Sequence, residues 1–411
     1  MKRLFIILIF ASACLRLSAQ KNNVAYFVNQ AITNSPLLRD YESQLSSLTL
    51  DSKIFLAGLK PQVNGVSTNS YAPVIGGWGY DNAITNGQQL SALTSVSKSF
   101  FNKKSIAIQL ASLQIQGQSV INNSKVSEQE LRKTVADQYI TVYGGQLQLD
   151  FNNRINNMLS REDSVLKKLT QDNVYKQTDY LSFVVTRQQQ LLNTSQLKIQ
   201  YNYDYATLNY LAGIVDTTII PLTDPQLRPV TIGDFPTSIY YKQFELDSLR
   251  LANDKTLIDV SYLPKINVFA DAGYNSSFAY KAYKNFGTSI GINISIPIYD
   301  GKQKKLQYSK IDIQERSRVF KKDFFAKQIN QQILQLIQQL KSTEQQIDLI
   351  NKQIKYTETL ITVNEKLLAT GDIRLTDFIL TLNNYFTAKN LVTQNYISRL
   401  KIMNQLNYWA R

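Results

Sequence analysis

The sequence predicts a mainly α-helical protein with a small membrane-spanning β part, built from one helix-strand-strand-helix unit that occurs twice. Three observations predict this fold class: an internal repeat, paired segments of alternating hydrophobicity, and two very long stretches with helical periodicity. The tetrapeptide that begins at Thr178 recurs in similar form at Thr376, and the pentapeptide at Leu208 recurs at Leu406, both at a spacing of 198 residues. Matching segments in one order at one spacing indicate a duplicated structural unit.

The beginning of the chain resembles a secretory signal peptide. Lys2 and Arg3 precede an apolar stretch over 4–10, and the small residues Ser18 and Ala19 end the segment. This pattern predicts cleavage after Ala19, so residues 1–19 are removed and the mature chain leaves the cytoplasm. An alternative is a lipoprotein, cleaved before Cys14 and anchored through it.

The composition argues against an enzyme and against a cofactor or metal site. The chain has no histidine, and its one cysteine, Cys14, lies within the predicted signal peptide. The commonest general base and the commonest metal ligands are therefore missing from the mature chain. The formal net charge is +14 and is spread along the sequence. For an exported protein this charge favours lipid headgroups or a polyanionic outer leaflet over nucleic acid.

The β part is predicted from segments that alternate between apolar and polar residues. The strongest covers residues 286–298, where every second residue except one is aromatic or aliphatic. Thirteen alternating residues suit a tilted membrane crossing better than a soluble hairpin. Its partner is expected over 264–274, and the first half holds weaker copies near 62–71 and 88–100. Four such strands do not close a barrel, so the open edges predict pairing with further copies of the chain: two copies give eight strands, and three give twelve.

The remaining sequence predicts long helices. Residues 303–369 lack proline and glycine, and six aliphatic residues fall seven apart: Ile333, Leu340, Ile347, Ile354, Ile361 and Leu368. Such a heptad pattern predicts coiled-coil packing. A similar helix is expected over 103–171, with returning helices over 177–213 and 375–410 and tips near 171–177 and 369–374. The first repeat then covers 20–213, a linker 214–233, and the second repeat 234–411.

Two segments, in this order and at these spacings, carry a resemblance to a known family. They are the strand exit Pro297-Ile298-Tyr299-Asp300-Gly301, followed by a basic helix start, and the tip over 371–379. Together with the duplicated plan they resemble the TolC family of outer-membrane efflux proteins. The resemblance implies a homotrimer with a twelve-stranded β-barrel in the outer membrane of a Gram-negative bacterium and an α-helical barrel in the periplasm. It also implies the role of an exit duct in a tripartite efflux pump or type I secretion system, joined by a periplasmic adaptor to an inner-membrane RND or ABC transporter.

The resemblance also suggests which residues matter. It assigns a periplasmic gate at the helix tips to Thr178, Asp179, Gly371, Arg374 and Asp377, and a strand-helix junction to Pro297, Tyr299, Asp300 and Gly301. In this view Arg374 pairs with Thr178 and Asp179 of the other tip. The residues themselves allow simpler roles: helix capping for the two aspartates, and a left-handed turn for Gly371, with Asn173 in that role at the first tip. The alternative function is a periplasmic coiled-coil scaffold without a pore.

Overall fold

A computed structural model describes residues 22–81, 87–228, 238–277 and 284–410. The predicted signal peptide with Cys14, and the last five residues of the predicted linker, lie outside these ranges. Of the described helices, none is both long and apolar enough to cross a membrane. The chain is mainly helical with four antiparallel strands, which confirms the predicted fold class. The elements are α2 (Val24–Asn34), α3 (Pro36–Gly58), β1 (Gln62–Tyr71), β2 (Gln88–Phe100), α5 (Lys103–Gln171), α6 (Gln177–Ala212), α7 (Ile239–Ser261), β3 (Lys265–Ser276), β4 (Phe286–Ser295), α8 (Gln303–Thr370) and α9 (Leu375–Trp409).

The chain divides into two compact units that do not follow the predicted repeats. Unit 1 comprises residues up to 39, 124–239 and 324–411, and unit 2 comprises 40–123 and 240–323. Each unit therefore takes residues from both halves of the sequence, and α5 and α8 contribute to both units. The repeat boundaries, which rest on the matching segments, stay a prediction.

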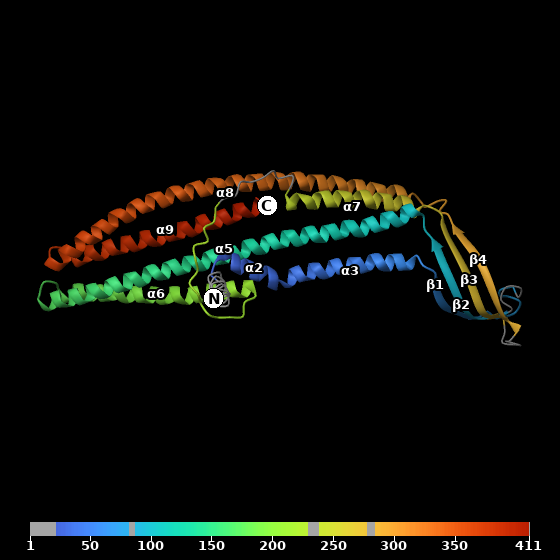
Figure 1. Ribbon diagram of the computed structural model, residues 1–411, viewed down its shortest axis with the longest axis horizontal. Coiled ribbons are helices and arrows are strands. Elements are labelled where there is room, and N and C mark those ends of the chain that lie inside the picture. The colour runs from blue at the N-terminus through green and yellow to red at the C-terminus, as the bar shows by residue number, and fades with distance from the viewer. Residues whose placement is uncertain (1–21, 82–86, 229–237, 278–283, 411) are drawn as a thin grey trace, which may run out of the picture. The chain divides into compact units, whose positions relative to one another are not determined.

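Unit 2 contains the four strands, which form one sheet in the order β1-β2-β3-β4 with every neighbouring pair antiparallel (Figure 1). The strands β2 and β3 come from opposite halves of the sequence and pair from Leu90 with Ser276 to Phe100 with Ile266. The strand β4 ends at Ser295, three residues before the predicted end. Pro297 follows closely, and a proline has no N–H to donate to a strand ladder.

The register gives the sheet two chemically different faces. Residues that pair across strands lie on the same face, and successive residues alternate between faces. The apolar face carries Val63, Tyr71, Leu90, Ala92, Val96, Phe100, Ile266, Val268, Ala270, Ala272, Tyr274, Phe286, Ile290, Ile292 and Ile294, interrupted by the polar residues Ser67, Asn69, Gln88, Thr94, Lys98, Ser276 and Thr288. The polar face carries Gln62, Asn64, Thr68, Ser70, Gln89, Ser91, Ser95, Ser97, Ser99, Lys265, Asn267, Asp271, Asn275, Ser289, Asn293 and Ser295, with Val66, Leu93 and Phe269 as its large apolar residues.

The large residue that interrupts the alternation of β3 lies opposite a glycine. Phe269 is on the polar face and pairs with Gly291 of β4. Its ring covers Gly291 so closely that a Cβ there would clash with it. The absence of a side chain on the neighbouring strand therefore makes room for an aromatic ring on this face.

Unit 1 holds all the clusters of buried hydrophobic side chains found in the described residues. One joins α2 to α5 and α6 through Phe27, Tyr139 and Leu208. A strap that begins after Gly213 crosses this region: Leu222 is buried, and its N–H and C=O both bond the side chain of Gln146.

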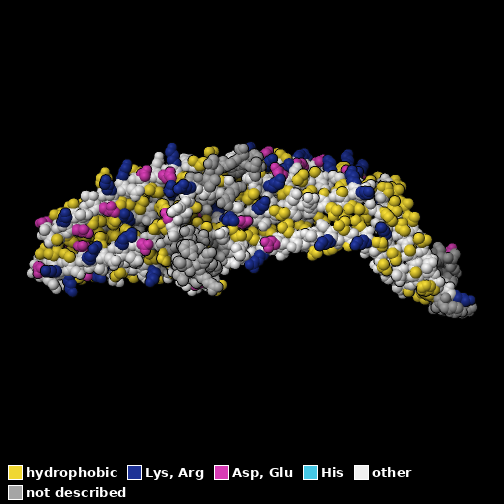
Figure 2. All heavy atoms as spheres, in the orientation of Figure 1, with side chains coloured by type: hydrophobic (Ala, Val, Ile, Leu, Met, Phe, Trp, Pro, Cys, Tyr) yellow, Lys and Arg dark blue, Asp and Glu magenta, His cyan; other side chains and the backbone are white. Residues whose placement is uncertain are grey.

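Unit 2, by contrast, has a small interior within one chain: its buried hydrophobic side chains are Tyr240, Leu246 and Leu251 of α7 and Ile311 of α8. The helix α3 buries none of its 23 residues, and all ten residues of β1 are exposed. The isoleucines of β4 are exposed to between 59% and 82%. Figure 2 shows hydrophobic side chains gathered on the surface in the region that Figure 1 draws as the sheet. Apolar surface of this extent normally marks an interaction site for protein or membrane.

Candidate functional site

The predicted site lies at the two helix tips of unit 1, which have matching backbone geometry. At the end of α5, the N–H of Val174 bonds the carbonyl of Leu169, and the N–H of Asn173 bonds that of Thr170. At the end of α8 the bonds run from Asp372 to Leu367 and from Gly371 to Leu368, each position 198 residues on. This pair of bonds is the Schellman motif, which satisfies the last carbonyls of a helix.

Both motifs use a residue in the left-handed conformation. Asn173 has φ 58° and Gly371 has φ 79°, as their predicted turn roles require. Gly371 is also constrained from outside, because a Cβ there would lie 2.6 Å from Cγ1 of Val174 in the first tip. Gly371 therefore serves the turn and the close approach of the two tips.

The capping roles considered for Asp179 and Asp377 are wrong. The N-cap positions belong to Lys176 and Arg374, and neither cap is made by a side chain. Each aspartate lies three residues further on, in the first turn of α6 or α9, where its negative charge complements the helix dipole. Asp377 is exposed and Asp179 is half-buried.

The predicted pairing of Arg374 with Thr178 and Asp179 does not occur within one chain. Thr178 and Arg374 are both exposed, and the described residues contain no ion pair of Arg374. The gate roles of these residues stay a prediction.

Tyr175, which the sequence analysis did not single out, connects the two tips. Its side chain is buried, and its hydroxyl lies 3.0 Å from the carbonyl oxygen of Ile373 and 3.3 Å from that of Leu368. Burial raises the pKa of Tyr175, and the charge of Asp372 raises it further. The hydroxyl therefore stays protonated and donates one hydrogen bond to the second tip.

A shared hydrophobic cluster lies beneath this contact. Its buried members come from both hairpins: Phe151, Ile155, Leu159, Leu166, Tyr175 and Phe183 from the first, and Ile361, Leu368, Leu375, Phe378, Leu382 and Phe386 from the second. Leu159, Leu166, Phe183, Leu368, Phe378 and Leu382 are fully buried. The two tips of one chain are thus packed together as one body.

The second predicted set lies in unit 2, where β4 leads into α8. Asp300 is the organising residue: its carboxylate accepts the N–H groups of Lys302 at 2.9 Å and Lys304 at 2.8 Å, and the hydroxyl of Tyr262 at 2.7 Å. The bond from the Lys304 N–H, followed by that from Tyr262, lowers the pKa of Asp300. The carboxylate thereby caps the first turn of α8.

The other junction residues shape the backbone. Gly301 has φ 63° and Lys302 has φ 71°, so two successive residues are left-handed. Tyr299 is 84% exposed. Pro297 is exposed beyond the end of β4. Their roles remain structural expectations.

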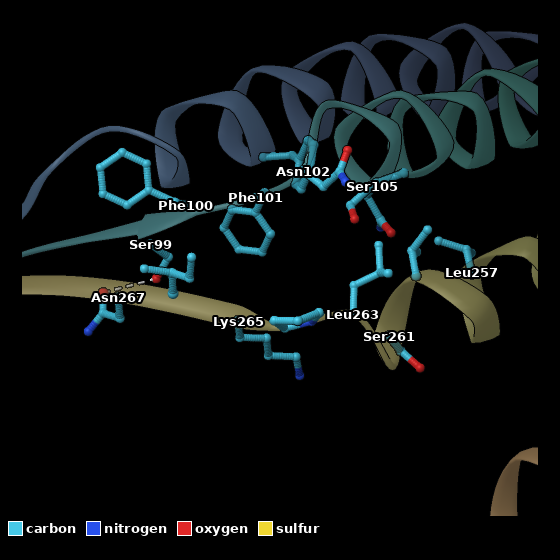
Figure 3. A pocket seen from close by; sticks show the side chains of 15 residues that line it. Ser99, Phe100, Phe101, Asn102, Ser105, Leu257, Ser261, Leu263, Lys265 and Asn267 are labelled. Atoms are coloured by element: carbon cyan, nitrogen blue, oxygen red, sulfur yellow. Dashed lines mark hydrogen bonds between the residues drawn. The ribbon is translucent and has the colours of Figure 1, made fainter. Parts of the chain in front are cut away.

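A pocket of about 290 Å³ lies within unit 2, between the ends of β2 and β3 and helices α3, α5 and α7. Its walls are mostly apolar and include Phe100, Phe101 and Leu263 (Figure 3). Ser99 donates to Asn267 at 3.3 Å on one side, and Lys265 is the one charged lining residue. The part of the chain that is described has no group of three metal-ligating side chains.

No family model and no curated protein matches this sequence. Solved structures do match. A membrane protein from Pseudomonas aeruginosa aligns with TM-score 0.76 at 12% identity, covering 94% of this chain and 92% of that one. The outer membrane protein VceC from Vibrio cholerae aligns with TM-score 0.75 at 10% identity, covering 94% and 96%. The MtrE outer membrane channel of Neisseria gonorrhoeae, in its open state, aligns with TM-score 0.72 at 11% identity, covering 94% and 88%. With a duplicated set of long helices and one four-stranded sheet, this chain has the TolC-family fold.

Proposed function

We propose that this protein is an outer-membrane channel that conducts substrates passively from an inner-membrane transporter across the periplasm and the outer membrane. The observation that carries the proposal is the sheet of unit 2. It has one apolar face, one polar face and two unpaired edges, β1 and β4. An apolar face suits lipid, and a face of serine, asparagine and glycine suits water.

The open edges support an assembly of identical chains. An unpaired strand edge in lipid leaves N–H and C=O groups without partners, at several kcal/mol for each. Pairing β4 of one copy with β1 of the next removes both edges, and three copies give a barrel wide enough for a passage. The exposed apolar side chains of unit 2 support the same assembly, because other copies and lipid would cover them. The proposed protein is therefore a homotrimer in the outer membrane of a Gram-negative bacterium.

The tips of unit 1 would form the periplasmic gate. In a trimer, three copies of the exposed Asp377 surround one axis, which attracts cations. Arg374 and Thr178, exposed in one chain, are then available to pair with the neighbouring copy, as is the half-buried Asp179. A periplasmic adaptor and an inner-membrane RND or ABC transporter complete the proposed pump or secretion system and supply its energy.

The alternative is a periplasmic scaffold without a pore. A scaffold accounts for the packed hairpins of unit 1 but leaves the aliphatic face of β4 in water. Detergent dependence separates the two functions. A scaffold is released from membranes by salt, whereas an inserted sheet stays until detergent is added.

The test is conductance of the detergent-extracted protein in a planar bilayer. We expect discrete, cation-selective openings in the wild type, weaker selectivity in Asp377→Ala, and larger or more frequent openings in Arg374→Ser. Asp348→Ala is the matched control, because Asp348 is an exposed acid on α8 away from the tip. Protein that washes off with salt and gives no conductance would exclude the channel, and equal changes in Asp348→Ala would exclude the gate.

A further inference from the structure

The end of the sheet that joins the helices is strongly basic. A lysine flanks every strand there: Lys60 before β1, Lys98 and Lys103 at the end of β2, Lys265 at the start of β3, and Lys302 after β4. With Lys104, Lys304 and Lys305, the segments 58–62, 97–105, 261–267 and 296–306 contain eight lysines and one acid, Asp300. Lys265 lies on the polar face of the sheet. We call the other seven lysines the basic girdle.

The girdle is not neutralised within the chain. Asp300 is engaged by two backbone N–H groups and by Tyr262. Lys304 pairs with Asp259 at 2.9 Å. Among the described residues, no acid lies within ion-pair distance of Lys60, Lys98, Lys103 or Lys305, and all four are exposed. The sequences that connect the strands at their opposite end, 72–87 and 277–285, contain two lysines, Lys281 and Lys284, and one acid, Asp81.

Two girdle segments stand where positive charge is unfavourable. Lys103 and Lys104 are the first two residues of α5, and Lys304 and Lys305 follow the first residue of α8; neither first turn has an acid. The N-terminus of a helix carries partial positive charge and favours acidic side chains. Local helix stability therefore does not account for these four lysines.

The side chain of Lys98 lies along the apolar face and points toward the helices. It is the one charged residue on the apolar face, beside Val268. Its Nζ lies 5.2 Å from the centre of the Phe100 ring, two residues closer to the helices. A lysine that lies along apolar surface and directs its ammonium toward one end is the arrangement found where hydrocarbon meets headgroups.

We infer that the basic girdle binds the anionic phospholipid headgroups of the leaflet that faces the helices. The inference rests on the proposed function, which puts the apolar face of the sheet in the membrane. The apolar face ends at Phe100 and Ile266, where the girdle begins. A lysine beside an anionic bilayer surface raises the affinity for that surface about fivefold.

The experiment removes four exposed girdle lysines, in the quadruple variant Lys60→Gln, Lys98→Gln, Lys103→Gln and Lys305→Gln. Detergent-extracted trimer is mixed with phosphatidylglycerol or phosphatidylcholine, and bound lipid is counted by native mass spectrometry. We expect the wild type to prefer phosphatidylglycerol by about tenfold or more, and the quadruple variant to bind both lipids equally. The same four positions changed to Arg should keep the preference.

The matched control removes four exposed lysines from unit 1, in Lys167→Gln, Lys168→Gln, Lys352→Gln and Lys355→Gln. It should behave as wild type. The mass of the assembly and the helical circular dichroism show whether each variant folds. An unchanged preference in the folded girdle variant overturns the inference, as does displacement of phosphatidylglycerol by an equal concentration of inorganic phosphate. If the wild type needs detergent for extraction but prefers neither lipid, the inference fails and the channel stands. If the wild type washes off with salt, the channel itself fails.

Discussion

The two helical hairpins of unit 1 have the same fold but place their buried polar residues at different levels. In α5 and α6, Gln190 donates to Asn152 at 2.5 Å, and Asn156 donates to Thr194 at 2.9 Å. The residues 198 positions later in α8 and α9 are all apolar: Ile350, Ile354, Ala388 and Val392. Nearer the tips the relation reverses. Asn364 donates to Thr381 at 2.9 Å in the second hairpin, where the first has the fully buried Leu166 and Phe183.

This exchange shows how a duplicated sequence can specify two separate hairpins. A buried amide is tolerated only where its partner is present, so the polar pair of one hairpin fits poorly against the apolar level of the other. Polar pairs of this kind set register and partner choice in coiled coils while contributing little to stability. The different positions of the polar pairs along the helices therefore favour pairing of α5 with α6 and of α8 with α9 over other pairings of these four helices.

The largest expected effect comes from placing a polar residue among the buried apolar residues of the second hairpin, at Ile350. Ile350→Asn removes a buried side chain of the second hairpin and buries an amide without the glutamine partner that Asn152 has. We expect the free energy of unfolding to fall by about 3 kcal/mol. Thermal and denaturant unfolding of the extracted protein, followed by helical circular dichroism, measures the change. Lys352→Asn, at an exposed position two residues away, should alter stability by no more than about 0.5 kcal/mol.

Adding Ala388→Gln to Ile350→Asn recreates the polar pair of the first hairpin in the second. If the hydrogen bond between the two amides is what makes them tolerable in the interior, the double variant recovers about 1 kcal/mol or more of the lost stability through coupling of the two sites. Simple additivity of the two single changes would show that the levels are not interchangeable and that local packing decides.

The reverse exchange has a smaller effect. Gln190 is buried, and Asn152→Ile removes the acceptor of its Nε2. This should lower the free energy of unfolding by about 1–3 kcal/mol. Asn152→Ile with Gln190→Ala copies the apolar level of the second hairpin and should be close to wild type in stability. The comparison predicts a second result for this double variant: more misassembled protein on refolding, measured by size-exclusion chromatography. If the double variant refolds with no more misassembled protein than wild type, the polar pairs do not determine which helices pair.

Tyr175 is a difference at the tips themselves, since Ile373 occupies the matching position of the second hairpin. Tyr175→Phe removes the hydrogen bond to the second tip and should reduce the free energy of unfolding by about 1 kcal/mol. The exposed Tyr356 provides the control, Tyr356→Phe, for which no change is expected.

The pH dependence of Tyr175 has a definite sign. Its pKa is higher in the folded protein than the ordinary value of 10.0, because burial disfavours the charged form. The unfolded chain therefore loses this proton first, and stability falls as the pH rises above about 10. Wild type should lose more stability than Tyr175→Phe between pH 10 and pH 11, as seen in thermal unfolding. Equal losses in the two proteins would mean that Tyr175 is not buried in the assembled protein.

Much of the fold followed from periodicity. Alternation over 62–71 and 88–100 coincides with β1 and β2, and the stretch 303–369, which lacks proline and glycine, coincides with most of α8. These patterns carry structural information because one face of each element must be apolar. The left-handed turn near Asp172 and Asn173 was expected from the family resemblance rather than from periodicity, and Asn173 adopts that conformation.

The contacts within the site were harder to predict. The hydroxyl of Tyr175 lies within hydrogen-bond distance of two backbone carbonyls of the other hairpin. Every residue has a backbone carbonyl, so the sequence does not indicate which one serves as an acceptor. The capping role assigned to Asp179 and Asp377 was wrong because each helix begins three residues earlier, with Lys176 or Arg374 at the cap. The predicted starts of the two returning helices, 177 and 375, agree with α6 and α9. Helices with these starts place both aspartates inside the first turn, where a side chain no longer occupies the N-cap position.

The smallest expected effect concerns the two strand-helix junctions. Asn102 and Asp300 are 198 residues apart and cap their helices alike, with Asn102 accepting the N–H of Lys104 at 2.9 Å. Only the second junction has a left-handed non-glycine residue, Lys302 at φ 71°. Glycine adopts that conformation without the strain of a Cβ, so Lys302→Gly should raise the free energy of unfolding by about 0.5–1 kcal/mol. Lys305→Gly, inside α8, should lower it by about 1 kcal/mol. Opposite shifts of the unfolding temperature in these two variants would establish the strain at Lys302, and a loss of stability in both would show that its side chain contributes more than its backbone conformation costs.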